Sequence, residues 1–234
     1  MELVRYADRP DLRELRRSAL NTFPEFMNHN AMGWKYWGRL YDEFPDFQLA
    51  LVDAGQLVAE VHSLPVPVEG GELPAGWDEA FERGMEAGGG NVLSLLAISV
   101  ASTRRGGGLA TQLIGGVRER AKRAGLGLVI APVRPTLKER YPLIPIEEFI
   151  TWRRDDGAHF DPWIRVHERV GGTIEKAAPH SMVIEAPVPD WEEWTQMAFP
   201  ADGTYVVPGM LAPLEVRDGR GVHVEPNVWL RHGV

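Results

Sequence analysis

The chain has 234 residues, 44% of them hydrophobic, which is enough for one large domain or for a domain with an appendage. It contains no cysteine, which excludes disulfides, thiolate metal sites and a cysteine nucleophile. The formal net charge of −8 at pH 7 argues against a nucleic-acid-binding surface, since such surfaces are usually basic, and suits a cationic or amine substrate.

No apolar run approaches the length of a membrane span, and the first residues alternate between charged and apolar side chains. A signal peptide would instead place an apolar stretch there. We therefore expect a soluble, cytoplasmic protein that contacts neither a membrane nor a nucleic acid.

The N-terminal part of the chain contains predicted helices and a predicted strand pair. Glu60 and His62 are two residues apart on the second strand, so they share one of its faces. With Trp37 from the aromatic-rich second helix they are candidates for substrate binding, and a solvated sheet edge is the alternative for Glu60 and His62. The predicted elements are helices over 11–22 and 30–43 and strands over 47–52 and 57–62, joined by a hairpin-length turn at 53–56.

A glycine-rich turn joins a predicted strand to a predicted helix in the middle of the chain. Residues 92–100 are apolar and have the length and β-branched content of a strand covered on both faces. After the three glycines at 106–108, an apolar stripe from Leu109 to Ala121 predicts a helix, and residues 126–131 predict a second buried strand. Strand, turn, helix and strand in one sheet form a right-handed parallel crossover.

Such a turn predicts an anion site, most often for phosphate, because it brings backbone N–H groups to the positive end of the helix dipole. A Walker loop is disfavoured, since Leu109 follows Gly108 where a lysine would be needed. A dinucleotide fingerprint needs an acidic residue about 20 residues further on, and the chain is apolar there, at 126–131. ATP, GTP, NAD and FAD are therefore disfavoured as ligands.

The segment Arg105-Gly-Gly-Gly-Leu-Ala110 fits the pattern Arg-x-x-Gly-x-Gly/Ala and resembles the pyrophosphate-binding motif of the GNAT acetyltransferase superfamily. A second segment, residues 164–174, resembles the family's late helix, which ends in a Leu-Tyr-Glu-Lys-Leu-Gly-Phe type sequence. Residues 3–15 resemble the family's first strand and helix. The motifs follow the family's order, and the resemblance covers roughly residues 1–186.

The resemblance implies an α/β (α+β) fold of the GNAT type, with a central mixed, twisted sheet and helices on both of its faces. The acetyl-CoA-binding domain would span residues 1–186, and its last two strands would lie at 173–176 and 182–185. Residues 187–234 would form a C-terminal extension packed on the core, because their aromatic side chains need burial.

Two insertions interrupt the pattern of the family, at residues 65–91 and 135–160. Insertions of this length in a compact domain are usually functional loops or decorations. The first one enters the sheet just before the strand at 92–100, so we expect it to form a lid over the substrate site.

The resemblance also implies acetyl-CoA as the co-substrate. Backbone N–H groups of the glycine loop would bind the pyrophosphate, arginines would add positive charge, and strand amides would bind the pantetheine and the thioester oxygen. A tight strand-to-helix turn with solvated arginines is the alternative. The residues concerned are Ile98, Val100, Arg104, Arg105, Gly106, Gly107, Gly108, Leu109 and Ala110.

His167 stands where the family's leaving-group acid, a tyrosine, stands in the late helix. Imidazole can perform the same proton transfer, so His167 is a candidate acid, and a partly buried histidine without a catalytic role is the alternative. The position that matches the family's strand base is Ser94, which could at best orient a water. His223 and Glu225 form a second His/Glu pair two residues apart, but neither pair has a third ligand, so no metal is expected.

These features predict an acetyl-CoA-dependent N-acyltransferase that transfers an acetyl group directly to the primary amine of a small, amino-acid-like acceptor. A catalytically inactive CoA-binding sensor is one alternative, because histidine replaces tyrosine and the strand carboxylate is missing. An enzyme that uses a longer acyl-CoA or an O-acceptor is another, with the aromatic-rich helix lining an acyl channel. The sequence leaves open the acceptor and the oligomeric state, including a homodimer.

Overall fold

A mixed sheet of nine strands forms the centre of the computed structural model, which describes residues 1–20 and 22–234. Its hydrogen-bonded order is β1-β2-β3-β4-β5-β9-β8-β7, and β6 pairs with β9 beside this path. Among the described strands, β4 and β5 run parallel and the other pairs run antiparallel. The strands are β1 Glu2–Arg5, β2 Gln48–Asp53, β3 Gln56–Val66, β4 Val92–Val100, β5 Leu128–Val133, β6 Thr173–Pro187, β7 Gly203–Tyr205, β8 Leu214–Arg217 and β9 Arg220–Gly233.

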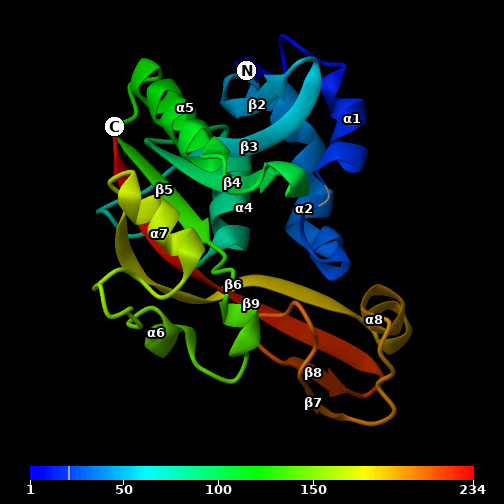
Figure 1. The fold of residues 1–234 in the computed structure, drawn as a ribbon. Helices are drawn as coiled ribbons and strands as arrows, with labels where there is room; N and C mark the ends of the chain where they lie inside the picture. The colour runs from blue at the N-terminus through cyan, green and yellow to red at the C-terminus, as the bar shows by residue number, and fades with distance from the viewer. Residues whose placement is uncertain (21) are drawn as a thin grey trace.

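Helices cover both faces of this sheet, as the resemblance implied. α5 and α7 lie over one face, and α4 lies over the other together with α1 and α2 (Figure 1). No helix within the described ranges has the length and apolarity to cross a membrane. Position 21, part of the helix predicted over 11–22, lies outside the described residues. The helices are α1 Leu12–Ala19, α2 Ala31–Tyr36, α3 Leu40–Glu43, α4 Trp77–Ala87, α5 Leu109–Arg123, α6 Ile146–Phe149, α7 Pro162–Arg169 and α8 Val188–Thr195.

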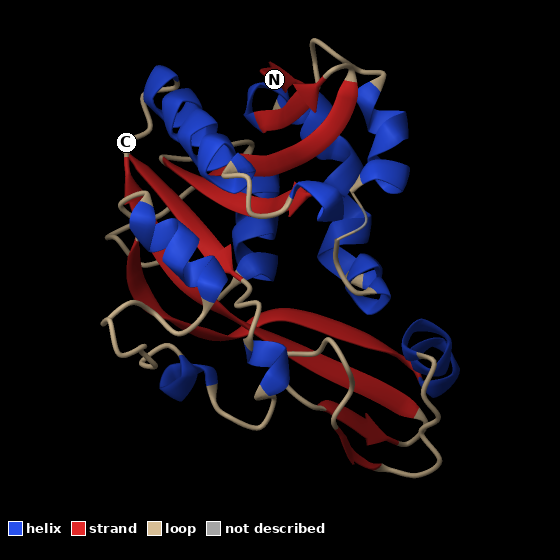
Figure 2. Cartoon of the chain, viewed as in Figure 1, coloured by secondary structure: helices blue, strands red, loops and turns tan. Residues whose placement is uncertain are grey.

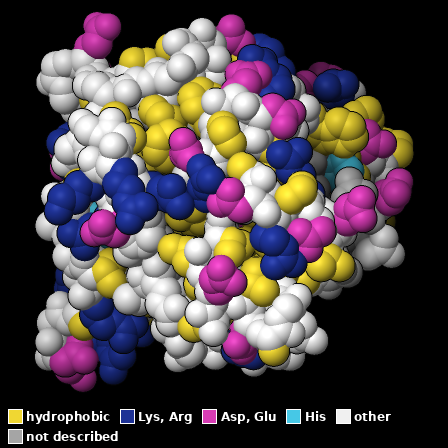
Figure 3. Space-filling view, turned by 90° about the horizontal axis from the view of Figure 1, so that it is seen from above, with side chains coloured by type: hydrophobic (Ala, Val, Ile, Leu, Met, Phe, Trp, Pro, Cys, Tyr) yellow, Lys and Arg dark blue, Asp and Glu magenta, His cyan; other side chains and the backbone are white. Residues whose placement is uncertain are grey.

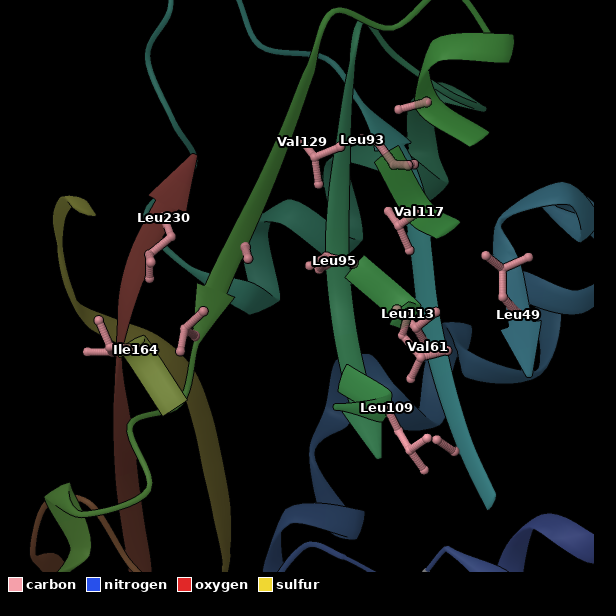
Figure 4. Packing of buried hydrophobic residues seen from close by; sticks show 14 of the residues in the cluster. Leu49, Val61, Leu93, Leu95, Leu109, Leu113, Val117, Val129, Ile164 and Leu230 are labelled. Atoms are coloured by element: carbon pink, nitrogen blue, oxygen red, sulfur yellow. The ribbon is translucent and has the colours of Figure 1, made fainter. Parts of the chain in front are cut away.

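The predicted apolar stripe of α5 packs on the sheet. Leu109, Leu113 and Val117 are all buried, and their spacing of four residues puts them on one side of the helix. Leu113 lies beside Val61 of β3 in the same buried cluster (Figure 4). This packing fixes the start of α5, and with it the glycine turn, against β3 and β4.

The two parallel strands separate soon after they meet. Within the described residues, β4 and β5 pair through Leu93 with Val129 and Ser94 with Ile130, and beyond Ser94 their pairing ends. β4 also carries a bulge, since the register with β3 shifts at this point and leaves Leu96 as the extra residue. The Trp77 indole Nε1 donates a hydrogen bond to the Leu96 carbonyl at 2.8 Å and holds the bulge in place. The sheet therefore opens between β4 and β5.

The first insertion is a core helix and does not form the expected lid. Trp77, Phe81 and Met85 of α4 are buried, because their spacing of four residues gives the helix a continuous apolar side. A Cβ built on Gly84 would lie 2.5 Å from Leu64 Cδ1, which shows how closely α4 approaches β3. The segment 65–91 thus stabilises the sheet on the face opposite to α5 and α7.

The C-terminal strand lies inside the sheet. Val228 of β9 pairs with Val133 of β5 on one side and with Ala177 of β6 on the other. The two short strands predicted at 173–176 and 182–185 are parts of the single strand β6, and the β6–β9 pair continues past the rest of the sheet to β8 (Figure 2). Residues 220–233 therefore complete the central sheet, whereas the sequence interpretation placed them in an extension packed on the core.

Candidate active site

A cavity of about 1010 Å³ opens where β4 and β5 separate. Five parts of the chain form its walls: the second half of β4, the glycine loop with the start of α5, the end of β5, one side of α7 and the segment after α1. The lining residues are Thr22, Phe23, Pro24, Leu95, Leu96, Ala97, Ile98, Val100, Arg104, Arg105, Gly106, Gly108, Leu109, Ala110, Thr111, Ala131, Pro132, Val133, Arg134, Thr136, Glu139, Trp163, Val166, His167, Arg169 and Val170.

The glycine loop has the backbone geometry of an anion site. Gly106 and Gly108 have φ angles of 82° and 73°, in the left-handed region that glycine adopts without steric cost. Gly108 is the N-cap of α5 and provides no side-chain cap, so the first N–H groups of the helix, starting at Leu109, are free for a ligand. The helix dipole adds positive potential at the same place.

The two arginines of the loop line the cavity but differ in their partners. Arg104 forms an ion pair with Asp53, which neutralises part of its charge. Arg105 is exposed and forms no ion pair with any described residue. Of the predicted cofactor-binding residues, Gly107 does not line the cavity, and the other eight do. Arg105 is thus the better placed of the two to attract an anion.

The predicted strand positions also lie on the cavity wall. Ile98 and Val100 are partly buried and line the cavity beyond the bulge of β4. Because the pairing with β5 ends at Ser94, backbone groups of β4 that point away from β3 have no strand partner from there on. They can accept or donate hydrogen bonds to a ligand in the cavity.

His167 lies at the cavity wall as predicted, but its protonation state differs from the one that an imidazolium acid requires. The side chain is buried, its Nδ1 is 2.9 Å from Nε2 of His232, and the Trp163 ring packs on it. Burial, with a smaller effect from His232, lowers the pKa of His167 to about 3. The ring is therefore neutral near pH 7, and His167 is not an imidazolium acid there.

The neutral His167 keeps one unused nitrogen. Its Nε2 and the Nδ1 of His232 are buried and have no hydrogen-bond partner among the described residues. One hydrogen bond joins the two rings, so each ring has one further nitrogen, and one of these two nitrogens carries a proton. A neutral imidazole pair can thus offer an N–H group, but it has no positive charge.

Ser94 lies close to the cavity but does not line it. The side chain is fully buried, and its Oγ donates a hydrogen bond to the Leu95 carbonyl at 3.3 Å. Ser94 occupies the last paired position of β4 and β5, where the strands are still too close together for a ligand. This position gives it no access to an amine, so we do not propose it as a group that orients water.

Glu60, His62 and Trp37 come together, but away from the cavity. The Glu60 carboxylate is fully buried and accepts hydrogen bonds from Tyr6 at 2.5 Å and from Arg16 at 2.7 Å. Burial opposes its ionisation, but His62, Arg16 and Tyr6 outweigh burial and lower the pKa of Glu60 to about 2. The Trp37 ring lies 5.0 Å from that of His62. The cluster is neither a substrate site nor a solvated edge, and it ties α1 to β3.

Arg134 is a cavity residue that sequence reasoning did not single out. It follows β5 directly, its Nε donates to the buried Glu225 carboxylate, and its Nη2 donates to the Gly209 carbonyl. The other Glu225 oxygen lies 2.7 Å from His223 Nε2. The spacing of His223 and Glu225 was visible in the sequence. Arg134 could have been noticed because it directly follows a buried parallel strand, a position that often carries functional residues.

Asp161 sets the position of α7 at the cavity. One of its oxygens caps the helix by accepting from the N–H groups of Trp163 at 2.8 Å and Ile164 at 3.2 Å. The other accepts from the Leu137 N–H at 2.6 Å and so ties α7 to the loop that follows β5.

We expect Asp161→Ala to lower the free energy of unfolding by about 1 to 2 kcal/mol, because the helix loses its N-cap. Urea denaturation measures this change. Asp190→Ala is a matched control, since Asp190 is exposed in the first turn of α8 and caps nothing. Equal stability of the two variants would contradict the role of Asp161.

Comparison with known proteins identifies the class of protein that this fold and cavity define. The curated relative "Arginine N-acetyltransferase avaD" of Aspergillus versicolor is 32% identical over 267 residues, which span 97% of this chain and 92% of the relative. No protein-family model matches the chain. The chain belongs to the GNAT superfamily. It is an N-acetyltransferase of the GNAT type.

Two solved structures have a similar fold over nearly the whole chain. The loading GNATL domain of CurA from Lyngbya majuscula has a TM-score of 0.64 and 18% identity, with 99% of this chain and 96% of that chain covered. The GphF GNAT-like decarboxylase in complex with isobutyryl-CoA has a TM-score of 0.58 and 17% identity, with 99% and 97% covered. At these identities the likeness concerns the fold alone.

Proposed function

We propose that the protein transfers an acetyl group from acetyl-CoA to the primary amine of a small, amino-acid-like acceptor. The observation that carries this proposal is the uncapped start of α5, with its left-handed Gly106 and Gly108, on the wall of a cavity that opens through the sheet. The avaD relative, an arginine N-acetyltransferase by name, supports an amino-acid acceptor. On the face in Figure 3, Lys and Arg side chains are interspersed with Asp and Glu, which suits a small ligand better than a nucleic acid.

The residues present fit the pyrophosphate and the pantetheine of acetyl-CoA. The N–H groups at Gly108, Leu109 and Ala110 would hold the pyrophosphate, with Arg105 as the nearby positive charge. Unpaired backbone groups of β4 near Ile98 would bind the pantetheine and polarise the thioester carbonyl. When bound, acetyl-CoA supplies the activated acetyl group.

The residues of the cavity must manage two proton movements, because the acceptor amine loses one proton and the departing sulfur gains one. His167 can offer a neutral N–H group, but its low pKa prevents it from acting as a charged acid near pH 7. The chain has no cysteine, so a cysteinyl thioester on the protein is excluded, and we propose that the transfer is direct. The acceptor and acetyl-CoA must then occupy the cavity together.

We expect CoA and acetyl-CoA to raise the melting temperature. At 100 times the dissociation constant, bound ligand should add about 2.7 kcal/mol to the free energy of unfolding. Differential scanning fluorimetry with CoA, ATP and NAD measures the effect. A shift with ATP or NAD and none with CoA would contradict the assignment.

Turnover is measured as release of CoA thiol with a panel of amines that includes arginine. Acetylation of one of these amines would support the proposed transfer to a small amine. Binding of CoA with no turnover for any amine would instead favour a binding module.

A further inference from the structure

One nitrogen of the Arg134 guanidinium is available to bind a ligand. Its side chain is 16% exposed, and Glu225 and the Gly209 carbonyl occupy its Nε and Nη2. The remaining amino group, Nη1, has no hydrogen bond to any described residue. Because two of its nitrogens are fixed by the buried Glu225 carboxylate and by the Gly209 carbonyl, the guanidinium is held in one orientation at the cavity wall.

The contacts of Arg134 place it next to the segment that follows α1. Arg134 directly follows β5, which ends at Val133, and its guanidinium donates to Glu225 of β9 and to the Gly209 carbonyl. Gly209, which accepts from Arg134, lies against Pro24, since a Cβ built there would be 3.3 Å from Pro24 Cγ. Pro24 also lines the cavity. The guanidinium therefore lies on the part of the cavity wall that is formed with Pro24, and we assign this part to the acceptor.

The surroundings of Arg134 carry more positive than negative charge. Lys138 is buried nearby, where its Nζ donates to the carbonyls of Tyr141 at 2.8 Å and Leu211 at 2.6 Å. Burial lowers the pKa of Lys138 to about 8, against the opposing effect of Glu225, so the amine is mostly charged at pH 7. Two cations thus face the single buried carboxylate of Glu225.

The carboxylate that lines the cavity does not balance this excess. Among the described lining residues, Glu139 is the one acidic side chain, and it is exposed, so water screens its charge. A negatively charged group of a ligand would neutralise the buried excess and satisfy Nη1 of Arg134.

We propose that Arg134, fixed by Glu225, binds the carboxylate of the acceptor, which makes the acceptor a free amino acid. Amines that lack a carboxylate, and amino groups within a peptide chain, would be poor acceptors. This assignment rests on the proposed function, because it names the class of molecule that enters the acceptor side of the cavity.

The test compares acceptors that differ in the carboxylate alone: arginine with agmatine, ornithine with putrescine, and lysine with cadaverine. With acetyl-CoA, we expect kcat/KM of the wild type to favour the best amino acid about 10- to 100-fold over its decarboxylated partner. Arg134→Gln should remove this preference by raising KM for the amino acid, and should leave the carboxylate-free amine unchanged.

Two further variants guard against misfolding. Arg134→Gln combined with Glu225→Gln removes both charges of the buried pair and should show the same loss of preference. Arg220→Gln removes an arginine from an exposed ion pair with Glu185 and should keep the preference of the wild type.

The outcomes separate this inference from the proposed function. A wild type that uses both members of every pair equally well would overturn the carboxylate site, as would equal losses on both members in the Arg134 variants. Calorimetry in the presence of CoA tests binding without turnover. If no amine is acetylated but an amino acid binds and its decarboxylated partner does not, the site stands and the proposed function fails. If neither partner of any pair binds or reacts, both fail.

Discussion

Replacing Gly108 with valine is expected to weaken CoA binding about 100-fold or more, which is the loss of several hydrogen bonds to a charged group. The φ angle of 73° strains any residue with a Cβ, and a β-branched side chain would cover the free N–H groups at the start of α5. Isothermal titration calorimetry with CoA measures the affinity, and circular dichroism checks the fold.

Gly125→Val is the matched control for this experiment. Gly125 has the same φ angle of 73°, lies just after the other end of α5, and does not line the cavity. Both variants carry similar backbone strain, so a selective loss of CoA binding in Gly108→Val isolates the role of the helix start. Normal CoA binding by a folded Gly108→Val would mean that the glycines serve as a turn alone.

The His167–His232 pair is expected to make the protein sensitive to acid. The pKa of His167 is lowered from 6.5 to about 3 in the folded state, mainly by burial. Between these two pH values, the unfolded state therefore binds a proton at this residue and the folded state does not. Stability is therefore complete above pH 6.5 and is lost as the pH falls towards 3. From about pH 7.5 to about pH 5, His167 alone should account for a loss of about 2 kcal/mol. His232, whose pKa burial lowers to about 4, acts in the same direction.

Urea denaturation at several pH values measures this effect. His167→Leu should reduce the loss of stability between pH 7.5 and 5 by about 2 kcal/mol, because leucine has no proton to bind. His180→Leu is the control, since His180 is exposed, and should keep the slope of the wild type. An unchanged slope in His167→Leu would show that the ring is not buried in its neutral form.

The local elements of the fold were readable from the sequence, because each depends on neighbours in the chain. The strand at 92–100 and the helix that follows the glycines matched the structure closely, as β4 and α5. Periodicity could not show which strand pairs with which. Residues 220–233 looked like part of a tail because nothing local marks a strand that must fit between β5 and β6. The insertion at 65–91 could be located in the sequence, but the sequence did not show that its helix, α4, packs in the core.

The site was predictable where a motif carries it and unpredictable where distant segments meet. The glycine loop was found because its residues are contiguous. Glu60 and His62 share a face as predicted, but burial under α1 could not be read from their spacing. Arg134 is oriented by Glu225 and Gly209, which lie far along the chain and could not be paired with it from the sequence. The pKa of His167 depends in the same way on a partner in β9.

The central place of β9 fixes the order in which the protein can be completed on the ribosome. β5 has emerged long before residues 220–233 are made, so the growing chain carries an open strand edge beside the future cavity throughout that interval. β6 is also made before β9 and has an unpaired edge until β9 pairs with it. Because β9 pairs with both strands, its arrival covers both edges, and we expect the chain to be most prone to aggregation before these residues are made.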